Sequence, residues 1–372
     1  MPAVRHVLVV GGGAAGAAAA ILLAEGGVSV DLVDLKPDVA ALGSGITLQG
    51  NALRVLRQLG VWDQVKAEGY GFDTLGLRAP DPAGGLIAEL TDIRTGGPDL
   101  PATLGMYRPA LARILIDRAL RSGVKIRFGV EPVALDGTTV TFDDGSTETY
   151  DLIIGADGLR SWTRRRIGID VEPQPVGMGI WRAFTARPAS VTRTDLYYGG
   201  PAYIAGYCPT GPDTLYAYLV EDVRDRSGLT PDEALATMRE LAGAYHGPWD
   251  EIRESLTDPA RVNYTAFESH LVDGPWNRGG VVLIGDAAHS CPPTLAQGAA
   301  QALEDASVLA ELLLREDALT DDLWQEFTGR RLDRVRTVVE ASLQLTRWQL
   351  AHERGDVPGL MALVAHLVET PA

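Results

Sequence analysis

A glycine-rich turn between an expected buried strand and an expected helix constrains the fold of this chain more than any other feature. The apolar run at residues 6–10 leads into Gly11-x-Gly13-x-x-Gly16, and an alanine-rich segment follows at residues 17–24. The first glycine of such a turn permits a tight bend, the second lets the backbone approach a pyrophosphate, and the third lets helix and strand pack closely. The helix N-terminus then offers free N–H groups to the phosphates. The sequence therefore predicts a βαβ unit that binds a dinucleotide.

An acidic residue after the next strand supports this interpretation. The apolar run at residues 28–33 ends at Asp34, at the position where a carboxylate can accept hydrogen bonds from a ribose diol. An ordinary glycine-rich turn would leave Asp34 unexplained. The turn and the acid alone do not separate NAD from FAD.

Two later segments repeat the pattern of a buried strand followed by an acid. Residues 151–155 lead to Asp157-Gly158, and Ser161 can cap a helix there, on which Arg165 and Arg166 form a solvated basic face.

The third such segment is residues 281–284, followed by Gly285-Asp286. A β-branched apolar run of this kind is typical of a buried strand. Asp286 is expected to meet a polar ligand at the strand's end; the alternative is an aspartate that caps a turn.

Charge and cysteine content exclude several classes of protein. The 372 residues include 33 basic and 49 acidic ones, so the net charge of −16 opposes binding to nucleic acid or anionic membranes. No apolar run reaches the ~18 residues of a spanning helix, and the N-terminus resembles no signal peptide. The two cysteines, Cys208 and Cys291, are too few for a disulfide framework and lack metal-site spacing. We expect a cytoplasmic protein without a metal.

Taken together, these segments resemble the single-component FAD-dependent aromatic hydroxylases, monooxygenases with the para-hydroxybenzoate hydroxylase fold and, in size, similar to salicylate and hydroxynicotinate hydroxylases. The motifs that carry the resemblance are Gly11-x-Gly13-x-x-Gly16 with Asp34, Gly155-Ala156-Asp157-Gly158-x-x-Ser161-x-x-Arg164, Gly285-Asp286-Ala287-Ala288-His289 with Pro292-Pro293, Ala302-Leu303-Glu304-Asp305-Ala306, and Met106-Tyr107-Arg108-Pro109-Ala110-Leu111. Each motif has moderate specificity, whereas the ordered set is highly specific.

The resemblance implies FAD as a tightly bound, non-covalent cofactor and NAD(P)H as a transient reductant without a glycine fingerprint of its own. In this family the glycine-rich turn holds the pyrophosphate and Asp34 the adenosine ribose. Arg108 would reach the phosphates or ribityl chain, Asp157 would serve FAD and the approach of NAD(P)H, and Asp286 would bind the ribityl and pyrophosphate side. The expected cofactor-binding residues are Gly11, Gly13, Ala14, Ala15, Gly16, Asp34, Lys36, Arg108, Asp157, Asp286, Gly298 and Ala299.

A loop at residues 292–298 departs from the family. It precedes an expected helix at about residues 299–313, whose N-terminus would point at the pyrimidine end of the flavin, where negative charge builds up on reduction. Many relatives read Gly-Gln-Gly-Ala-Asn where this chain reads Ala-Gln-Gly-Ala-Ala. Ala296 removes backbone freedom and Ala300 removes an amide side chain, so we expect altered geometry beside the flavin but no loss of FAD binding.

No catalytic base is evident. Some relatives place a histidine in the segment that corresponds to residues 42–51, where the nearest polar candidate is Thr47. A tyrosine, His289 or water could take a substrate proton, or the substrate could need no deprotonation. By the period of two in a strand, Tyr203 and Tyr207 share a face, as do Tyr216 and Tyr218. The substrate-pocket candidates are Thr47, Arg182, Tyr203, Tyr216, Pro292 and Pro293.

The expected fold class is α/β, α+β overall, with a discontinuous Rossmann-like FAD domain. We predict this domain at residues 1–70, 100–175 and 275–320, a mostly antiparallel substrate-binding sheet at 71–99 and 176–274, and C-terminal helices at 321–372. Residues 321–350 should form one long helix or two.

The resemblance implies a monooxygenase that uses NAD(P)H and O₂ to hydroxylate a small aromatic or conjugated molecule through a C4a-hydroperoxyflavin, as a monomer or homodimer. The alternatives are an epoxidase or reductase on the same scaffold, or a non-catalytic FAD-binding protein. A halogenase is disfavoured because the Trp-x-Trp-x-Ile-Pro signature is missing from the sequence.

Overall fold

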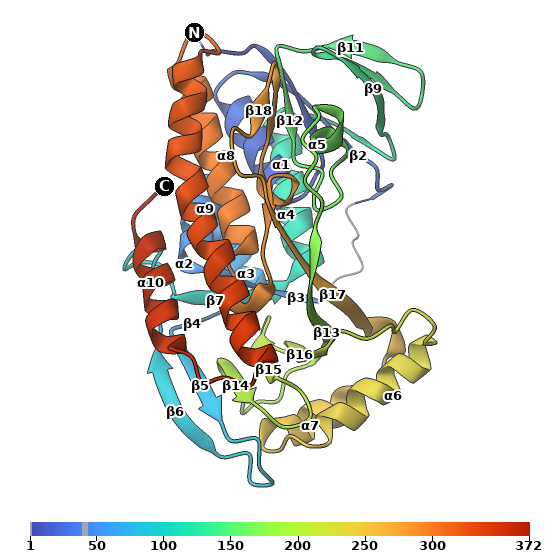
Figure 1. Ribbon diagram of the computed structural model, residues 1–372, viewed down its shortest axis with the longest axis vertical. Helices are drawn as coiled ribbons and strands as arrows, with labels where there is room; N and C mark the ends of the chain where they lie inside the picture. The colour runs from blue at the N-terminus through green and yellow to red at the C-terminus, as the bar shows by residue number, and fades with distance from the viewer. Residues whose placement is uncertain (1, 39–43) are drawn as a thin grey trace.

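A computed structural model describes residues 2–38 and 44–372 and places them around two large sheets (Figure 1). The smaller of the two has six strands in the order β18-β19-β12-β1-β2-β8. These strands are β1 (His6–Val10), β2 (Ser29–Asp34), β8 (Lys125–Phe128), β12 (Leu152–Gly155), β18 (Asn277–Arg278) and β19 (Val281–Leu283). All neighbours pair in parallel except β18, which is antiparallel to β19.

Both faces of this sheet are covered, which explains why its strands read as continuous apolar runs. Helices α1 (Ala14–Glu25), α4 (Arg108–Arg121) and α8 (Gly298–Arg315) pack on one face in the largest hydrophobic core. The other face meets a small antiparallel sheet of β9 (Pro132–Asp136), β10 (Thr139–Phe142) and β11 (Thr147–Thr149). The predicted strands and helices of this region are therefore confirmed, within a few residues at their ends.

The larger sheet has eight strands and is mostly antiparallel, as predicted. Its order is β20-β17-β13-β16-β15-β14-β5-β6. The strands are β5 (Thr74–Arg78), β6 (Leu86–Thr91), β13 (Gln174–Ala186), β14 (Thr194–Tyr198), β15 (Ile204–Pro209), β16 (Thr214–Asp222), β17 (Val262–Leu271) and β20 (His289–Ser290). The segment at residues 74–91 thus joins a sheet formed mainly by residues 174–271.

One face of the eight-stranded sheet is closed by helices α6 (Pro231–Ala242) and α7 (Pro248–Ser255), which lie at the lower end of Figure 1. Trp181, Tyr207 and Leu219 point to these helices in a second hydrophobic core. A capping box is present at the start of α6, since Thr230 and Glu233 bond each other's backbone N–H groups. The opposite face carries Arg182, Tyr216 and the remaining alternate residues, and it faces the rest of the molecule.

A third, three-stranded sheet and several helices surround that opposite face. The sheet has the order β3-β7-β4, with β3 (Gly45–Gln49), β4 (Tyr70–Phe72) and β7 (Thr103–Tyr107), and α2 (Gly50–Gln58) and α3 (Trp62–Glu68) lie beside it. Residues 321–350 form one long helix, α9 (Asp321–Leu350), which runs along the molecule, and α10 (Val357–Glu369) packs on it (Figure 1). No helix of the described residues is long and apolar enough to cross a bilayer.

A buried arginine connects the two large sheets. Arg164 is fully buried on α5 (Trp162–Arg166), and its guanidinium donates to the carbonyl of Ala287 at 2.9 Å. The same nitrogen lies 3.1 Å from Nε2 of His270 on β17. Because arginine only donates, Nε2 must accept, so the Nδ1–H of His270 faces the Ser290 hydroxyl at 2.9 Å. This arrangement requires a neutral imidazole.

The neutral state of His270 predicts a loss of stability in mild acid. Burial, with the charge of Arg164, lowers the pKa of His270 from 6.5 to about 4. The unfolded chain then binds a proton at a pH where the folded chain does not, so the free energy of unfolding falls as pH drops from about 6.5 towards 4. Urea unfolding at about pH 7.5 and pH 5 should show that His270→Gln removes about 2 kcal/mol of the wild-type decrease. An equal decrease in both proteins would contradict this assignment.

Candidate active site

The three strand-then-acid segments of the sequence meet at one edge of the six-stranded sheet. Val10 pairs with Gly155, and Gly155 pairs with Leu283, so the last residues of β1, β12 and β19 lie in one row. Val33 of β2 continues this row beside Val10. The residues that follow each strand are therefore neighbours, as expected for a ligand site at the carboxyl ends of parallel strands.

The glycine-rich turn has the geometry that phosphate binding requires. Gly11 has a φ of +106°, and a Cβ there would lie 2.4 Å from the carbonyl oxygen of Ala156. A Cβ on Gly16 would lie 1.9 Å from the carbonyl oxygen of Gly11. By contrast, no atom lies within 4 Å of a Cβ built on Gly13, the N-cap of α1. Two glycines thus hold the turn together while the third leaves open space at a helix N-terminus, which fits a pyrophosphate.

Two alanines continue this turn into the helix. Ala14 and Ala15 are the first residues of α1, and Ala14 is only half-buried. Ala15 is buried, and a Cβ on Gly285 of the third segment would lie 3.0 Å from its Cβ. The first and third segments are therefore in close contact.

Asp34 lies against the glycine-rich turn. Its Oδ2 accepts a hydrogen bond from the backbone N–H of Gly12 at 2.8 Å, and its Oδ1 accepts one from the N–H of Lys36 at 2.8 Å. The carboxylate is half-buried, and the Lys36 side chain is exposed. The side chain of Asp34 is therefore fixed beside the glycine-rich turn, and its contact with a ribose stays a prediction.

The carboxylate of Asp157 turns inward. It accepts hydrogen bonds from the Ser161 hydroxyl at 2.5 Å and from the N–H and hydroxyl of Thr163 at 2.8 and 2.9 Å. Ser161 caps α5 as predicted, and Arg165 and Arg166 are exposed as predicted. The structure gives Asp157 a role in shaping the turn, while its contact with FAD or NAD(P)H stays a prediction.

Asp286 occupies a partly enclosed position in the 3₁₀ turn η2 (Gly285–Ala287). Its side chain is exposed, yet surrounding protein raises the pKa of the carboxyl by desolvation, while the charges of His289 and Arg108 oppose the shift. Arg108 is the exposed first residue of α4. An acid and an arginine thus face the same region from the ends of β19 and β7.

Sequence reasoning missed the residue that holds this turn in place. Asp305 on α8 was recognised only as part of a motif, but its Oδ2 accepts from the N–H of Gly285 at 2.9 Å and contacts His289 Nε2 at 2.7 Å. His289 therefore supports the site and is not free to act as a base. The periodicity of α8 could identify Asp305 as an acid on a buried helix face.

The loop at residues 292–298 has an unusual backbone conformation at Ala296. Ala296 ends the 3₁₀ turn η3 (Pro293–Leu295) with a φ of +52°, a left-handed conformation that favours glycine. The buried side chain of Gln297 exchanges hydrogen bonds with Asn51 at 3.1 and 3.3 Å. A Cβ on Gly298 would meet no atom within 4 Å, and Ala299 follows on the first turn of α8. A second open helix N-terminus therefore lies in the site.

The face of the eight-stranded sheet that is turned away from α6 and α7, called the open face below, presents an arginine next to a tyrosine. Nε of Arg182 donates to the Tyr216 hydroxyl at 3.2 Å, and a second guanidinium nitrogen donates to the Thr265 hydroxyl. The Tyr216 and Tyr218 rings share this face, as predicted, with centroids 5.0 Å apart. Arg182 pairs with no carboxylate in the part of the chain that the structure describes. It is a half-buried cation held only by neutral hydroxyls.

This face borders β3 and the start of α4. A Cβ on Gly45 of β3 would lie 2.4 Å from the Cβ of Tyr216. The Tyr107 ring, next to Arg108, contacts the Phe184 ring with centroids 4.2 Å apart. Burial raises the pKa of Tyr216, whereas the charges of Arg182 and Arg108 oppose that shift. Tyr216 thus lies within electrostatic reach of both arginines.

The remaining substrate-pocket candidates divide into two groups. Thr47 is half-buried and lies near the Cys208 thiol on the open face, beside Tyr216. Pro292 is buried and Pro293 exposed at the start of the 292–298 loop. Leu42 and Gly43, the start of the segment that holds a histidine in relatives, lie outside the described residues.

Tyr203 lies away from this group. Its hydroxyl donates to Asp222 at 2.6 Å, and its ring lies 5.7 Å from that of His352. The prediction that Tyr203 and Tyr207 share a face is wrong, because Tyr207 points into the core under α6 and α7. Tyr203 precedes β15, so the strand period does not extend to it.

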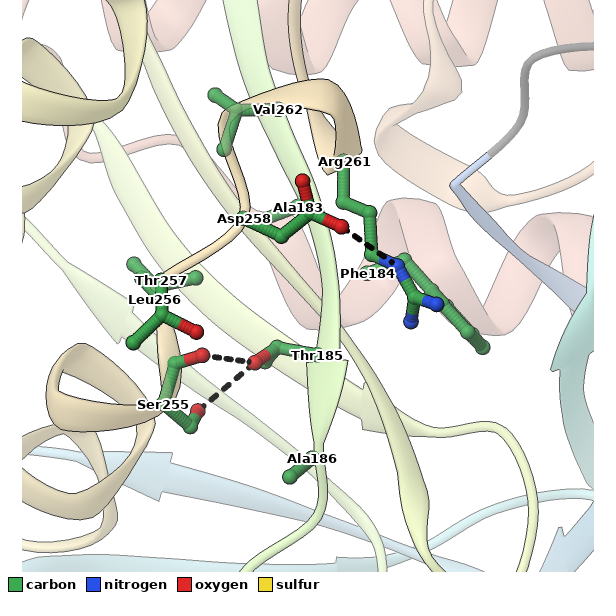
Figure 2. Close-up of a pocket in the computed structure, with 10 residues that line it drawn as sticks. All are labelled: Ala183, Phe184, Thr185, Ala186, Ser255, Leu256, Thr257, Asp258, Arg261 and Val262. Atoms are coloured by element: carbon green, nitrogen blue, oxygen red, sulfur yellow. Dashed lines mark hydrogen bonds and ion pairs between the residues drawn. The ribbon is translucent and has the colours of Figure 1, made fainter. Parts of the chain in front are cut away.

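Two cavities lie apart from these residues. The larger, about 240 Å³, lies between the end of β13 and the segment from α7 to η1 (Pro259–Arg261). Figure 2 shows the Thr185 hydroxyl bonded to Ser255 there, with Arg261 beside Phe184 and paired with Asp258. The other, about 210 Å³, adjoins Asp31, Val33, Lys125, Arg127, Glu148 and Tyr150. Neither is lined by residues of the glycine-rich turn or by Asp286.

Comparison with known proteins finds FAD-binding proteins and monooxygenases that match most of this chain. A family described as an FAD binding domain matches residues 5–342. The protein named "Putative FAD-dependent monooxygenase YetM" of Bacillus subtilis is 31% identical over 358 residues, with 94% of this chain and 95% of that protein covered. The 3-amino-4-hydroxybenzoate 2-monooxygenase of Streptomyces cremeus is 31% identical over 350 residues, covering 89% and 84%. Among solved structures, 2-methyl-3-hydroxypyridine-5-carboxylic acid oxygenase superposes with a TM-score of 0.82 at 27% identity, covering 97% and 96%.

The glycine-rich turn supplies a matched pair of variants. Gly16→Ala should lower the free energy of unfolding by about 1–3 kcal/mol, because the new methyl overlaps the Gly11 carbonyl. Gly13→Ala should change it by no more than about 1 kcal/mol, since the space is open, yet raise the FAD dissociation constant at least about tenfold. Denaturant unfolding without FAD and fluorescence titration with FAD measure the two effects. Unchanged FAD affinity in Gly13→Ala would contradict the assignment of the pyrophosphate to this turn.

Proposed function

The chain belongs to the FAD-binding-domain family of FAD-dependent aromatic monooxygenases, and from this premise we propose that it hydroxylates a small, anionic aromatic substrate with NAD(P)H and O₂. The observation that carries the proposal is the position of Tyr216. It is hydrogen-bonded to Arg182 on the sheet, and its Cβ would lie 2.4 Å from a Cβ on Gly45, which pairs with Tyr107 beside Arg108. The proposed substrate face would therefore adjoin the proposed cofactor edge.

FAD is the cofactor, and when bound it supplies the chemistry of reduction by NAD(P)H and activation of O₂. The residues that fit it are the glycine-rich turn for the pyrophosphate, Asp34 for the adenosine ribose, and Asp286 and Arg108 for the ribityl and phosphate groups. The open N-terminus of α8 at Gly298 adds backbone N–H groups that favour negative charge. These assignments rest on the geometry of the side chains and on the resemblance.

Arg182 is proposed to hold the negative group of the substrate. The positive charge of a guanidinium that bonds only neutral hydroxyls is not compensated. Carboxylates and phenolates are anions that such a group binds. Two relatives support this choice, because the names of the Streptomyces cremeus enzyme and of the structural neighbour specify substrates that are aromatic carboxylic acids. Hydrogen bonds from the guanidinium to the Tyr216 and Thr265 hydroxyls would orient it.

The groups around Arg182 stay protonated near neutral pH. Burial raises the pKa of the Tyr216 hydroxyl, and it raises the pKa of the Cys208 thiol to about 11. Tyr216 and Cys208 therefore act as hydrogen-bonding groups, and neither removes a proton at pH 7. We propose that the arginine's charge favours the ionised substrate, so that solvent takes any phenolic proton.

Apolar side chains on the same face would exclude water from the reacting groups. Tyr218 lies beside Tyr216, and Phe72 packs against Cys208 and Tyr216. A dry site favours oxygen transfer to the ring over loss of hydrogen peroxide. The net charge of −16 argues against nucleic acid as a partner. The assembly state, monomer or homodimer, and the predicted domain boundaries stay predictions.

The function is tested by incubating FAD-loaded protein with NADH or NADPH and a panel of hydroxybenzoates, hydroxypyridine carboxylates and uncharged phenols. We expect substrate-stimulated O₂ consumption and a product heavier by one oxygen atom. Turnover without O₂ would indicate a reductase, and an epoxide product an epoxidase. Retention of FAD without any stimulated NAD(P)H oxidation would indicate a non-catalytic protein.

Arg182→Met should weaken binding of the anionic substrate selectively. Loss of a charge-assisted contact of about 1.5–3 kcal/mol predicts a KM higher by about 10- to 100-fold for carboxylates, with FAD affinity unchanged. Arg253→Met on α7 is the control, because it removes the same charge from the opposite side of the sheet, where Arg253 pairs with Asp250. Steady-state kinetics with a carboxylate and its neutral amide measure the effect. An equal change in KM for the carboxylate and the amide would contradict the proposed role of Arg182.

A further inference from the structure

Two adjacent acidic residues lie buried on α8, behind the cofactor-binding edge. Glu304 is 2% exposed and Asp305 is 0% exposed. Arg331 of α9, also fully buried, donates to both, from Nε to Asp305 at 2.7 Å and from Nη1 to Glu304 at 3.1 Å. Burying charges is costly unless they are paired and hydrogen-bonded, and here they are.

Every contact that the structure gives to the Asp305 carboxylate is strong and specific. Oδ1 faces Arg331, and Oδ2 receives the N–H of Gly285 at 2.9 Å and contacts Nε2 of His289 at 2.7 Å. Burial alone would raise the pKa of Asp305, but His289 and Arg331 lower it below its ordinary value. The carboxylate is therefore ionised at neutral pH.

The two contacts of Asp305 Oδ2, with the Gly285 N–H and with His289, fix the segment that contains Asp286 on both sides. Gly285, directly before Asp286, has a φ of +58°, so its N–H is held in a conformation few residues adopt. His289, three residues after Asp286, lies against Trp276 with ring centroids 5.2 Å apart. With both ends held, the side chain of Asp286 has a defined direction out of the η2 turn.

We propose that Asp305 is a positioning residue of the FAD site: it fixes Gly285 and His289 so that Asp286 is pre-set to bind the ribityl side of the cofactor. This inference rests on the placement of Asp286 at FAD, which is part of the function proposed above. Asp305 itself is fully buried and acts through the η2 turn, to which it is hydrogen-bonded. Arg331 keeps the carboxylate ionised and oriented.

Asp305→Asn tests the proposal, because the amide keeps the size of the side chain and removes its charge. The FAD dissociation constant should rise at least about tenfold, and the visible absorption bands of the FAD that still binds should shift. Leu309→Ala is the matched control: it removes a fully buried side chain one turn further along α8 and destabilises the fold without touching the carboxylate. Its FAD affinity should stay within about twofold of wild type, with an unshifted spectrum.

Equal FAD affinities and spectra for Asp305→Asn and Leu309→Ala would overturn the proposal, since both would then report only lost stability. If Asp305→Asn fails to fold, His289→Gln tests the proposal instead, because it removes the contact of His289 with Asp305 and leaves the hydrogen bond from Gly285. A raised dissociation constant with a shifted flavin spectrum supports the role, and wild-type values refute it. Wild-type protein that binds FAD but hydroxylates nothing would refute the proposed reaction and leave this comparison intact.

Discussion

The close approach of the glycine-rich turn to the end of β12 is the contact on which the rest of the site depends. Gly11 can pass the carbonyl of Ala156 only because it has no side chain. The pairing of Val10 with Gly155, and of Gly155 with Leu283, brings three segments that are far apart in sequence to one edge. A ligand that spans this edge can therefore contact all three at once.

Buried polar residues hold these loops against the core from behind. Arg164 donates to the Ala287 carbonyl, and Asp305 accepts from the Gly285 N–H, so both ends of the η2 turn are bound to fully buried charged groups. Breaking either contact would leave a buried polar group without one of its hydrogen-bond partners, which is destabilising. The polar groups that face outward, Asp286 and Arg108, remain available to a ligand.

Much of this fold could be predicted from local signals. The three strand-then-acid segments and the shared face of Tyr216 and Tyr218 follow from apolar runs and the period of a strand. The features that could not be predicted depend on tertiary contacts. Tyr203 stands outside its strand, so periodicity could not place it, and the inward turn of Asp157 depends on Thr163, whose hydrogen bonds nothing in the sequence specifies. The role of Asp305 depends on a partner from another helix, Arg331, which local patterns do not identify. Assignment of the cofactor contacts themselves stays a prediction.

A crystal structure of the protein with FAD would test the central claim most directly. We predict one extended FAD with its pyrophosphate at Gly13, its adenosine ribose at Asp34 and its ribityl chain at Asp286. The flavin ring should then lie towards the sheet face that carries Arg182 and Tyr216. FAD bound with either aspartate out of contact, or with its ring turned away from that face, would contradict the account.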